Sequence, residues 1–300
     1  MKDTYESPLN SRYASDRMKY IFSPDFKFRT WRRLWIALAE SEKELGLNIT
    51  DEQIAELKAH KDDINYDVAA AREKEVRHDV MSHVYAYGVQ CPNAKPIIHL
   101  GATSCYVGDN TDVIIMREAM LLIRKELVNL LNVLAKFAVE YKDMPCLAFT
   151  HFQPAQPTTV GKRAALWLNE FLMDFQNLEF QLSQLKLLGS KGTTGTQASF
   201  MELFDNDTDK VKALDKMIAE KMGFDSCFAV SGQTYSRKLD YQMLTVLCGI
   251  AMSATKFSND IRLLQHMKEI EEPFEKHQIG SSAMAYKRNP MRSERIASVS

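Results

Sequence analysis

Three long stretches of this sequence contain almost no residue that would end a helix, and they constrain the fold more than any other feature. Asp109–Tyr141 contains neither proline nor glycine, Gly161–Leu188 has glycine only at its first position, and Ser236–Ile270 is interrupted only by Gly249. Apolar residues recur along one face of the first stretch at helical spacing. Helices of about 30 residues are about 45 Å long. We therefore expect an elongated bundle of long helices.

The region before these stretches predicts shorter helices. An apolar stripe at helical spacing runs through residues 25 to 47 and ends at Gly46. Thr50 follows, with Gln53 three residues later, which is the pattern of a capped start to a second, short helix. A third helical stretch is expected from about Asp67 to Tyr87.

The stretch from Cys91 to Gly108 has the composition of a loop, because it contains two prolines and two glycines. No alternating strand pattern of any length competes with the helical patterns. We therefore predict an all-α protein. A small N-terminal helical domain is expected in residues 1–108 and a central helical-bundle domain in residues 109–300.

The composition argues against several classes of function. A formal net charge of −1 gives no global reason to bind nucleic acid or a membrane surface. The five cysteines are scattered and include no CxxC pair, which argues for reduced thiols and against a zinc site. No secretory signal and no apolar segment of membrane-spanning length is visible. We expect a cytoplasmic protein without a metal and without nucleic-acid or membrane partners.

One segment near the C-terminus has the composition of a reactive loop. It reads Gly-Ser-Ser-Ala-Met-Ala-Tyr-Lys-Arg-Asn-Pro over residues 280–290 and lies between two helical patterns. Small hydroxyls beside a cation suit a site that removes a proton next to a carboxylate and holds the resulting negative charge. On composition alone, a surface turn is the simpler interpretation. The segment, however, resembles the GSSxMPxKxNP signature of the fumarase/aspartase superfamily, with Ala285 in place of the proline.

A second segment carries a histidine between polar residues and prolines. It reads Thr-His-Phe-Gln-Pro-Ala-Gln-Pro-Thr-Thr over residues 150–159, just before a long helical stretch. A lone histidine is more often structural than catalytic. This segment resembles a conserved block of the same superfamily, and of the adenylosuccinate lyase family in particular. The resemblance implies that His151 is the general acid that protonates the departing nitrogen and that Thr150 contacts the substrate.

The segment His99–Asp112 precedes the first long helical stretch. Its small residues, hydroxyls and backbone N–H groups at a helix entrance form a natural cradle for a carboxylate. A capped helix start is the simpler interpretation, since Asp109 or Thr111 would serve as the cap. The segment resembles the first conserved region of the superfamily, in which Thr103 and Ser104 would hold a carboxylate of a succinyl group.

Arg77, His78 and Asp79 lie inside a helical pattern, with His83 about one turn beyond His78. Two histidines at this spacing can bind a metal, but no third ligand is evident. A solvated, charged turn is a further interpretation. Resemblance to the adenylosuccinate lyase family implies that Arg77, His78 and Asp79 contact the nucleotide part of the substrate.

Three more segments resemble the same family. Arg12 and Tyr13 correspond to residues that reach the substrate phosphate, a role that suits the planar fork of arginine. Gln233 corresponds to a residue that hydrogen-bonds the substrate. The glycine-rich segment Gly189–Ser199 lacks the GxxxxGK[ST] spacing of a phosphate loop, so we interpret its glycines as mainly conformational.

The resemblance also assigns roles in the C-terminal segment. Ser281 would be the base, Lys287 and Asn289 would stabilise the intermediate, and Arg295 would contact the substrate. Glu294 corresponds to the carboxylate that orients and tunes the acid histidine. Serine is a poor base at its free pKa, so the cation of Lys287 and nearby N–H dipoles must favour its alkoxide when the loop is closed.

Taken together, these segments imply a C–N lyase of purine biosynthesis. It would release fumarate from adenylosuccinate, giving AMP, and from SAICAR, giving AICAR, with no cofactor. Family members are homotetramers whose active sites form from three subunits. Argininosuccinate lyase and fumarase share the C-terminal signature, but the segments at Arg12 and Arg77 fit them poorly. A helical scaffold that has lost its activity is the alternative from another class.

Two departures from the family remain. Family members extend for well over a hundred residues beyond Ser300, which completes the bundle and adds a third helical domain. We therefore expect this chain to be a fragment or short form with weak or no independent activity. The second departure is Ala285, since proline stabilises a loop by about 0.4–1 kcal/mol where its geometry suits. We expect a looser loop that closes more slowly, which Ala285→Pro would reverse.

Overall fold

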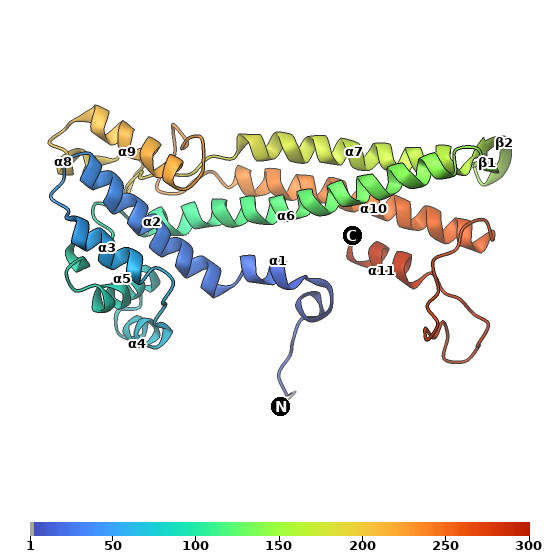
Figure 1. The fold of residues 1–300 in the computed structure, drawn as a ribbon, viewed down its shortest axis with the longest axis horizontal. Helices are drawn as coiled ribbons and strands as arrows, with labels where there is room; N and C mark the ends of the chain where they lie inside the picture. The colour runs from blue at the N-terminus through green and yellow to red at the C-terminus, as the bar shows by residue number, and fades with distance from the viewer. Residues whose placement is uncertain (1–2) are drawn as a thin grey trace. The chain divides into compact units, whose positions relative to one another are not determined.

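The computed structural model describes residues 3–300, and their contacts form two compact units, each discontinuous in sequence (Figure 1). The first unit contains residues up to 122 and residues 184–239, and the second contains residues 123–183 and 240–300. The domain boundary expected near residue 108 stays a prediction. No helix among residues 3–300 has both the length and the apolar character needed to cross a membrane.

The first unit is built mainly from short helices and the N-terminal part of α6. It contains the π-helix η1 (Leu9–Tyr13), α1 (Asp16–Ile21), α2 (Pro24–Glu44), α3 (Asp51–Ala59), α4 (Tyr66–Val76), α5 (Asp79–Gln90), the 3₁₀ helix η2 (Lys95–Ile97), α8 (Ala198–Leu203) and α9 (Thr208–Lys221). The second unit contains the C-terminal half of α6 (Ser104–Glu140), the strands β1 (Pro145–Thr150) and β2 (Gln153–Thr159), and nearly all of the helices α7 (Val160–Gln184), α10 (Lys238–His266) and α11 (Met291–Val299).

The signals expected at the end of α2 and at the start of α3 are present. Gly46 follows the end of α2 with φ of 104°. Thr50 and Gln53 form both hydrogen bonds of a capping box at the start of α3. These predictions are confirmed, because each signal lies within one turn of the helix end that it specifies.

A buried arginine on α2 ties together the connections around it. Arg32 is 2% exposed, and its guanidinium donates to the carbonyls of His60 and Asp63 and to Gln90 Oε1, and lies over the ring of Tyr87. A buried charge is stable only when hydrogen bonds replace its contacts with water, and these acceptors supply them for the Arg32 guanidinium. Arg32 therefore joins the α3–α4 connection to α5.

The expected helix over Asp67–Tyr87 is wrong, because the chain forms two helices there. Arg77 adopts a left-handed conformation with φ of 55° and ends α4. His78 then begins α5 by accepting a hydrogen bond from Met81 N through Nδ1 at 3.4 Å. No glycine or proline marks the break, so the helical pattern hides it.

The expectation of three long helices is confirmed. Helices α6, α7 and α10 contain 37, 25 and 29 residues. In the second unit, Ala164 and Trp167 of α7 pack against Ile261 and Leu264 of α10, with Phe257 packed against this cluster. Trp167 also donates its indole N–H to Asp260 Oδ2 at 2.8 Å.

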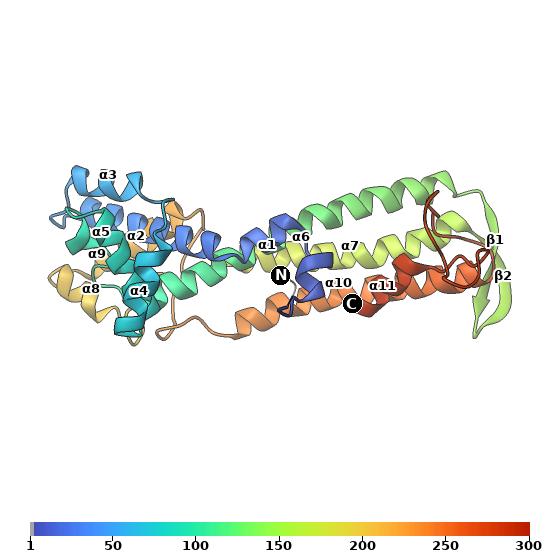
Figure 2. The same ribbon diagram turned by 90° about the horizontal axis from the view of Figure 1, so that it is seen from below.

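The expectation that no strand is present is wrong at one place. Strands β1 and β2 pair antiparallel, and Thr150 lies opposite Gln153. Figure 2 shows this hairpin joining the end of α6 to the start of α7. The turn residues His151 and Phe152 have φ of 53° and 57°, which is typical of a two-residue hairpin turn. Both strands are mostly exposed, so no alternating apolar pattern reveals them.

One carboxyl group in the first unit is buried without a partner. Glu42 on α2 is 0% exposed, and neither of its carboxylate oxygens has a hydrogen-bond partner. Burial raises the pKa of Glu42 from 4.5 to about 9, so the side chain is neutral at pH 7 in the folded state. In the unfolded chain the same carboxyl group is ionised at pH 7.

We predict that Glu42 makes the protein less stable as pH rises. The folded pKa lies above the unfolded one, so its contribution is fully present below about pH 4.5 and is lost as pH rises towards 9. Between pH 5 and pH 7 the loss amounts to about 2–3 kcal/mol. Urea unfolding followed by tryptophan fluorescence checks this: Glu42→Gln should flatten the pH dependence, and a difference from wild type that does not vary with pH would contradict it.

Candidate active site

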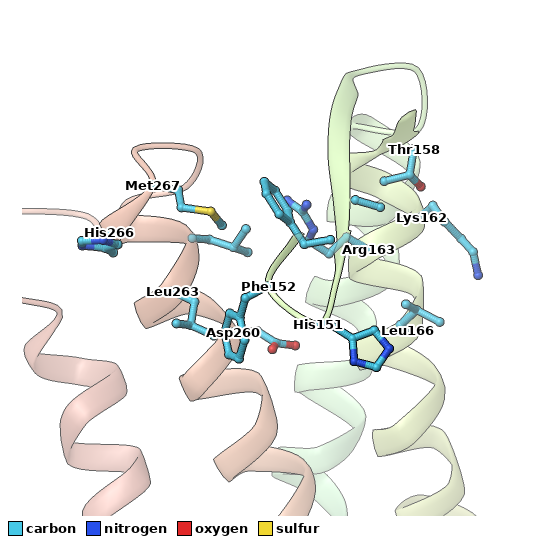
Figure 3. Close-up of a pocket in the computed structure, with 13 residues that line it drawn as sticks. His151, Phe152, Thr158, Lys162, Arg163, Leu166, Asp260, Leu263, His266 and Met267 are labelled. Atoms are coloured by element: carbon cyan, nitrogen blue, oxygen red, sulfur yellow. The ribbon is translucent and has the colours of Figure 1, made fainter. Parts of the chain in front are cut away.

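His151 lies in the second unit at a cavity of about 590 Å³ between the β1–β2 hairpin, α7 and the last turns of α10 (Figure 3). Its position follows from the hairpin turn, which presents His151 and Phe152 between the two helices. The Phe152 side chain is 80% exposed. Within residues 3–300, no hydrogen bond or ion pair engages the His151 imidazole. It is therefore available to exchange a proton.

Two other charged groups of the cavity, Arg163 and Asp260, have structural partners. Arg163 donates to Glu269 Oε2 at 2.8 Å and to the Leu147 carbonyl at 2.9 Å. Asp260 accepts from Trp167 at 2.8 Å and from Lys256 at 3.4 Å. The remaining wall is largely apolar and includes Phe149, Leu166, Leu263, Leu264 and Met267.

The C-terminal loop connects α10 to α11 and holds Ser281 by its backbone. Ser281 Oγ accepts from the N–H groups of Ala283 and Met284 at 3.3 and 3.2 Å. Two donors aimed at one hydroxyl oxygen stabilise negative charge on that oxygen, which is what a serine base requires. Lys287, six residues further along, is exposed.

Asn289 closes the neck of this loop. Its Nδ2 donates to the Gly280 carbonyl at 2.8 Å, so in this conformation the amide holds the loop together. A Cβ at Gly280 would lie 2.0 Å from the Lys287 carbonyl oxygen, which explains the glycine there. The role predicted for Asn289 in stabilising an intermediate stays a prediction.

The predicted acid and base do not meet within one chain. His151 is on the hairpin, Ser281 and Lys287 are on the loop, and Glu294 is in the first turn of α11, all in the second unit. Among the described residues, no hydrogen bond or ion pair joins His151 to Ser281 or Glu294. Figure 1 shows the hairpin and the loop on opposite sides of the end of α10.

The cap expected for the first long helix is wrong. Helix α6 begins at Ser104, so Asp109 and Thr111 lie inside it and are buried. Asp109 instead accepts from Tyr235 N at 2.9 Å and from Arg237 at 3.4 Å. It therefore fastens the segment that carries Gln233 to the start of α6.

The glycine-rich segment joins the same region of the first unit. Asn110 exchanges two hydrogen bonds with the backbone of Gly189, at 3.1 and 3.0 Å. Ser199 Oγ donates to the Gly101 carbonyl at 2.7 Å, just before Thr103. At Gly195, φ is +79° and a Cβ would lie 2.0 Å from the Ser231 carbonyl oxygen. The conformational role predicted for these glycines is confirmed.

A phosphate-loop role for this segment does not fit its lysine. Lys191 is 6% exposed and forms an ion pair with Asp215. Ser190 donates to the same carboxylate through both its N–H and its hydroxyl, each at 2.7 Å. Lys191 therefore has a structural role as a buried ion-pair partner in the first unit.

His99 has a defined chemistry that sequence reasoning missed. Its Nδ1 accepts from Trp35 Nε1 at 2.9 Å, which leaves the ring proton on Nε2. Burial, helped by the charge of His78, lowers the pKa of His99 to about 4. His99 is thus a neutral N–H donor at physiological pH, close to Thr103 and Ser104 in the chain. The backbone of His99 is left-handed, with φ of 66°, and no residue type in the sequence marks this conformation.

The remaining predicted binding residues are exposed or half-buried. Arg77 lines a shallow cavity, His78 caps α5, and Asp79 accepts from Val80 N at 2.8 Å. Arg12 and Tyr13 lie in η1 in the first unit. Thr150 ends β1, Gln233 precedes α10, and Arg295 lies in α11. Their predicted contacts with a substrate stay predictions.

Comparisons with known proteins show the family of this chain. A protein family described as lyase matches residues 22–300. The adenylosuccinate lyase of Saccharomyces cerevisiae is 56% identical over 99% of this chain and 62% of its own length. The one from Schizosaccharomyces pombe is 54% identical over 98% of this chain and 62% of its own length. The chain thus spans somewhat less than two thirds of these relatives.

Two solved structures share the fold. The 3-carboxy-cis,cis-muconate lactonizing enzyme of Pseudomonas putida has a TM-score of 0.81 at 24% identity, covering 97% of this chain and 64% of its own. A fumarate lyase from Mesorhizobium has a TM-score of 0.79 at 22% identity, covering 95% of this chain and 62% of its own. At these identities the likeness shows the fold alone, and the fumarase/aspartase-like helical fold expected from the sequence is confirmed.

We predict that Gly280→Ala opens the C-terminal loop. The added Cβ would meet the Lys287 carbonyl oxygen at 2.0 Å, and a backbone atom cannot yield as a flexible side chain does. Trypsin should cleave at the exposed Lys287 and Arg288 faster than in wild type. Gly108→Ala is the matched control, since nothing lies within 4 Å of its added Cβ. Equal cleavage rates in the two variants would contradict the prediction.

Proposed function

This chain belongs to the lyase family, and from that premise we propose that it eliminates fumarate from adenylosuccinate, leaving AMP, and from SAICAR, leaving AICAR. The observation that carries the proposal is that the chain presents both Ser281, whose hydroxyl oxygen accepts from two N–H donors, and His151, whose imidazole is unengaged among residues 3–300. A base and an acid are the two groups that such an elimination requires.

In the proposed reaction, the Ser281 alkoxide takes a proton from the succinyl carbon that is β to the leaving nitrogen. The electron pair left on carbon moves into the adjacent carboxylate and forms a doubly charged aci-carboxylate. The pair then returns, forms the C=C bond of fumarate and breaks the C–N bond. His151 gives its proton to the departing nitrogen. Every step moves protons and electron pairs only.

The surroundings of Ser281 support its role as the base. The N–H groups of Ala283 and Met284 favour its alkoxide, and the ammonium of Lys287 would offset the charge of the aci-carboxylate. We assign the orientation of His151 to Glu294 and further stabilisation of the intermediate to Asn289. The loop excludes water when it closes, which strengthens each of these interactions.

We also propose how the substrate is held. Arg12 and Tyr13 bind the phosphate, and Arg77, His78 and Asp79 contact the nucleotide. The succinyl carboxylates are assigned to Thr103 and Ser104, with Thr150, Gln233 and Arg295 as further contacts. His99, as a permanent N–H donor, fits an acceptor of the substrate without adding charge.

We propose that the active protein is a homotetramer in the cytoplasm. Acid and base do not meet within one chain, so a site that contains both needs a second copy or a large rearrangement. Helices α7 and α10 expose several large apolar side chains, namely Met173, Phe180, Tyr241, Leu244 and Met252. Exposed apolar surface of this kind is typical of subunit interfaces. The cysteines are free thiols, as expected in a reducing compartment.

We predict that the natural polypeptide that contains these residues releases fumarate from adenylosuccinate and not from argininosuccinate, and that His151→Ala lowers its kcat by about 10²- to 10⁴-fold because the acid is lost. Absorbance assays of fumarate formation measure both effects. His60→Ala, at a half-exposed histidine of the first unit, is the control and should keep wild-type rates. Preference for argininosuccinate would refute the assigned substrate, and full activity in His151→Ala would refute the assigned acid.

A further inference from the structure

We propose that Gln265 is a positioning residue that fixes both ends of the loop carrying Ser281 and Lys287, and that Glu272 extends this control to α11. The proposal rests on the proposed function, because it concerns the residues assigned there as base and stabiliser. Its structural part, the anchoring of the loop, can be tested without any activity.

Gln265 is in the last turn of α10 and is 6% exposed. Its Nε2 donates to the Arg288 carbonyl at 3.0 Å, and its Oε1 accepts from Glu272 N at 3.1 Å. Glu272 lies on the segment that leaves α10, and Arg288 lies on the segment that returns to α11. One buried amide therefore holds both ends of the connection.

Glu272 continues this chain of contacts to the next helix. Its carboxylate accepts from Ser293 N at 2.7 Å and from Arg292 N at 3.1 Å, in the first turn of α11. The residue at the N-cap position, Pro290, makes no side-chain cap. A carboxylate at a helix N-terminus satisfies free N–H groups and is favoured by the helix dipole. Glu272 thereby places the helix that carries Glu294.

Arg292 donates to the Pro273 carbonyl and to Glu275 in the first half of the connection, and Arg288 lies over the ring of Phe274. The part that carries Ser281 has few other contacts. Asn289 joins Gly280 at the neck, and Ser281 bonds only to N–H groups two and three residues away. Residues 282–288 are all exposed. With so little packing of its own, the loop takes its position from its anchors. Gln265 is the anchor whose side chain is buried, and its loss removes the side-chain partner of both Glu272 N and Arg288 O.

The hydrogen bonds of Gln265 differ from those of a residue that only stabilises the core of the second unit. Both partners of Gln265 are backbone groups of the loop, and neither belongs to the cluster of Trp167 and Ile261. Removing the amide therefore frees the loop and spares the helix packing. Displacing a catalytic group by about 1 Å can slow a reaction by about a hundredfold.

The test compares Gln265→Met with Ile261→Val. Methionine has a similar length and no hydrogen-bonding amide, whereas Ile261→Val lies one turn earlier on α10 and trims the core cluster without touching the loop. Hydrogen exchange of the amides in residues 272–293 is measured in both folded variants. We expect about tenfold or faster exchange in Gln265→Met only, because a partner of the loop backbone is lost. Unchanged exchange there, or an equal rise in Ile261→Val, would overturn the anchoring.

Fumarate release from adenylosuccinate by the natural polypeptide that contains these residues is the second measurement. We expect kcat of Gln265→Met to fall by about ten- to a hundredfold with KM within about twofold, because base and cation are misplaced while binding groups remain. Ile261→Val should keep wild-type kcat. Faster exchange with an unchanged kcat would overturn the positioning role. A wild-type protein that releases no fumarate would refute the proposed function instead, and the exchange result would still decide the anchoring.

Discussion

The packing of Trp167 on α7 against Phe257 on α10, with ring centroids 5.1 Å apart, holds the part of the molecule on which the candidate catalytic groups depend. Trp167 is 3% exposed and also donates to Asp260 at 2.8 Å, so both its surface and its polar atom fix α10. The next turn of α10 supplies one wall of the His151 cavity and the amide of Gln265. Truncating a buried tryptophan costs about 3–5 kcal/mol. The same contact therefore supports both the acid and the loop of the base.

In the second unit, His151 and Ser281 lie on different segments, and each has its own surroundings. The hairpin turn presents His151 at a largely apolar cavity, whereas the loop presents Ser281 with two N–H donors on its oxygen. Neither group neutralises the other within the chain. That separation suits chemistry that needs an acid and a base at once, because a direct hydrogen bond between them would engage both before a substrate arrived. It also makes a second copy of the chain the natural source of the missing partner.

The sequence predicts those features that are encoded locally. The long helices follow from the lack of proline and glycine, and the start of α3 follows from the spacing of Thr50 and Gln53. The break at Arg77 and the turn at His151 escaped prediction, since left-handed backbone at a non-glycine residue leaves no pattern. Gln265 escaped it for another reason. Its partners are backbone atoms of the loop after α10. Every residue has the same backbone atoms, so the sequence does not show which of them Gln265 will bond.

We propose that the acid of one chain works with the base of another. The most direct test mixes His151→Ala and Ser281→Ala chains of the natural polypeptide that contains these residues, after each is shown to be inactive alone. Unfolding and refolding them together should restore fumarate release from adenylosuccinate to about a quarter of wild type, because random assembly pairs intact groups in that share of symmetric sites. A mixture that stays as inactive as its components would contradict the claim.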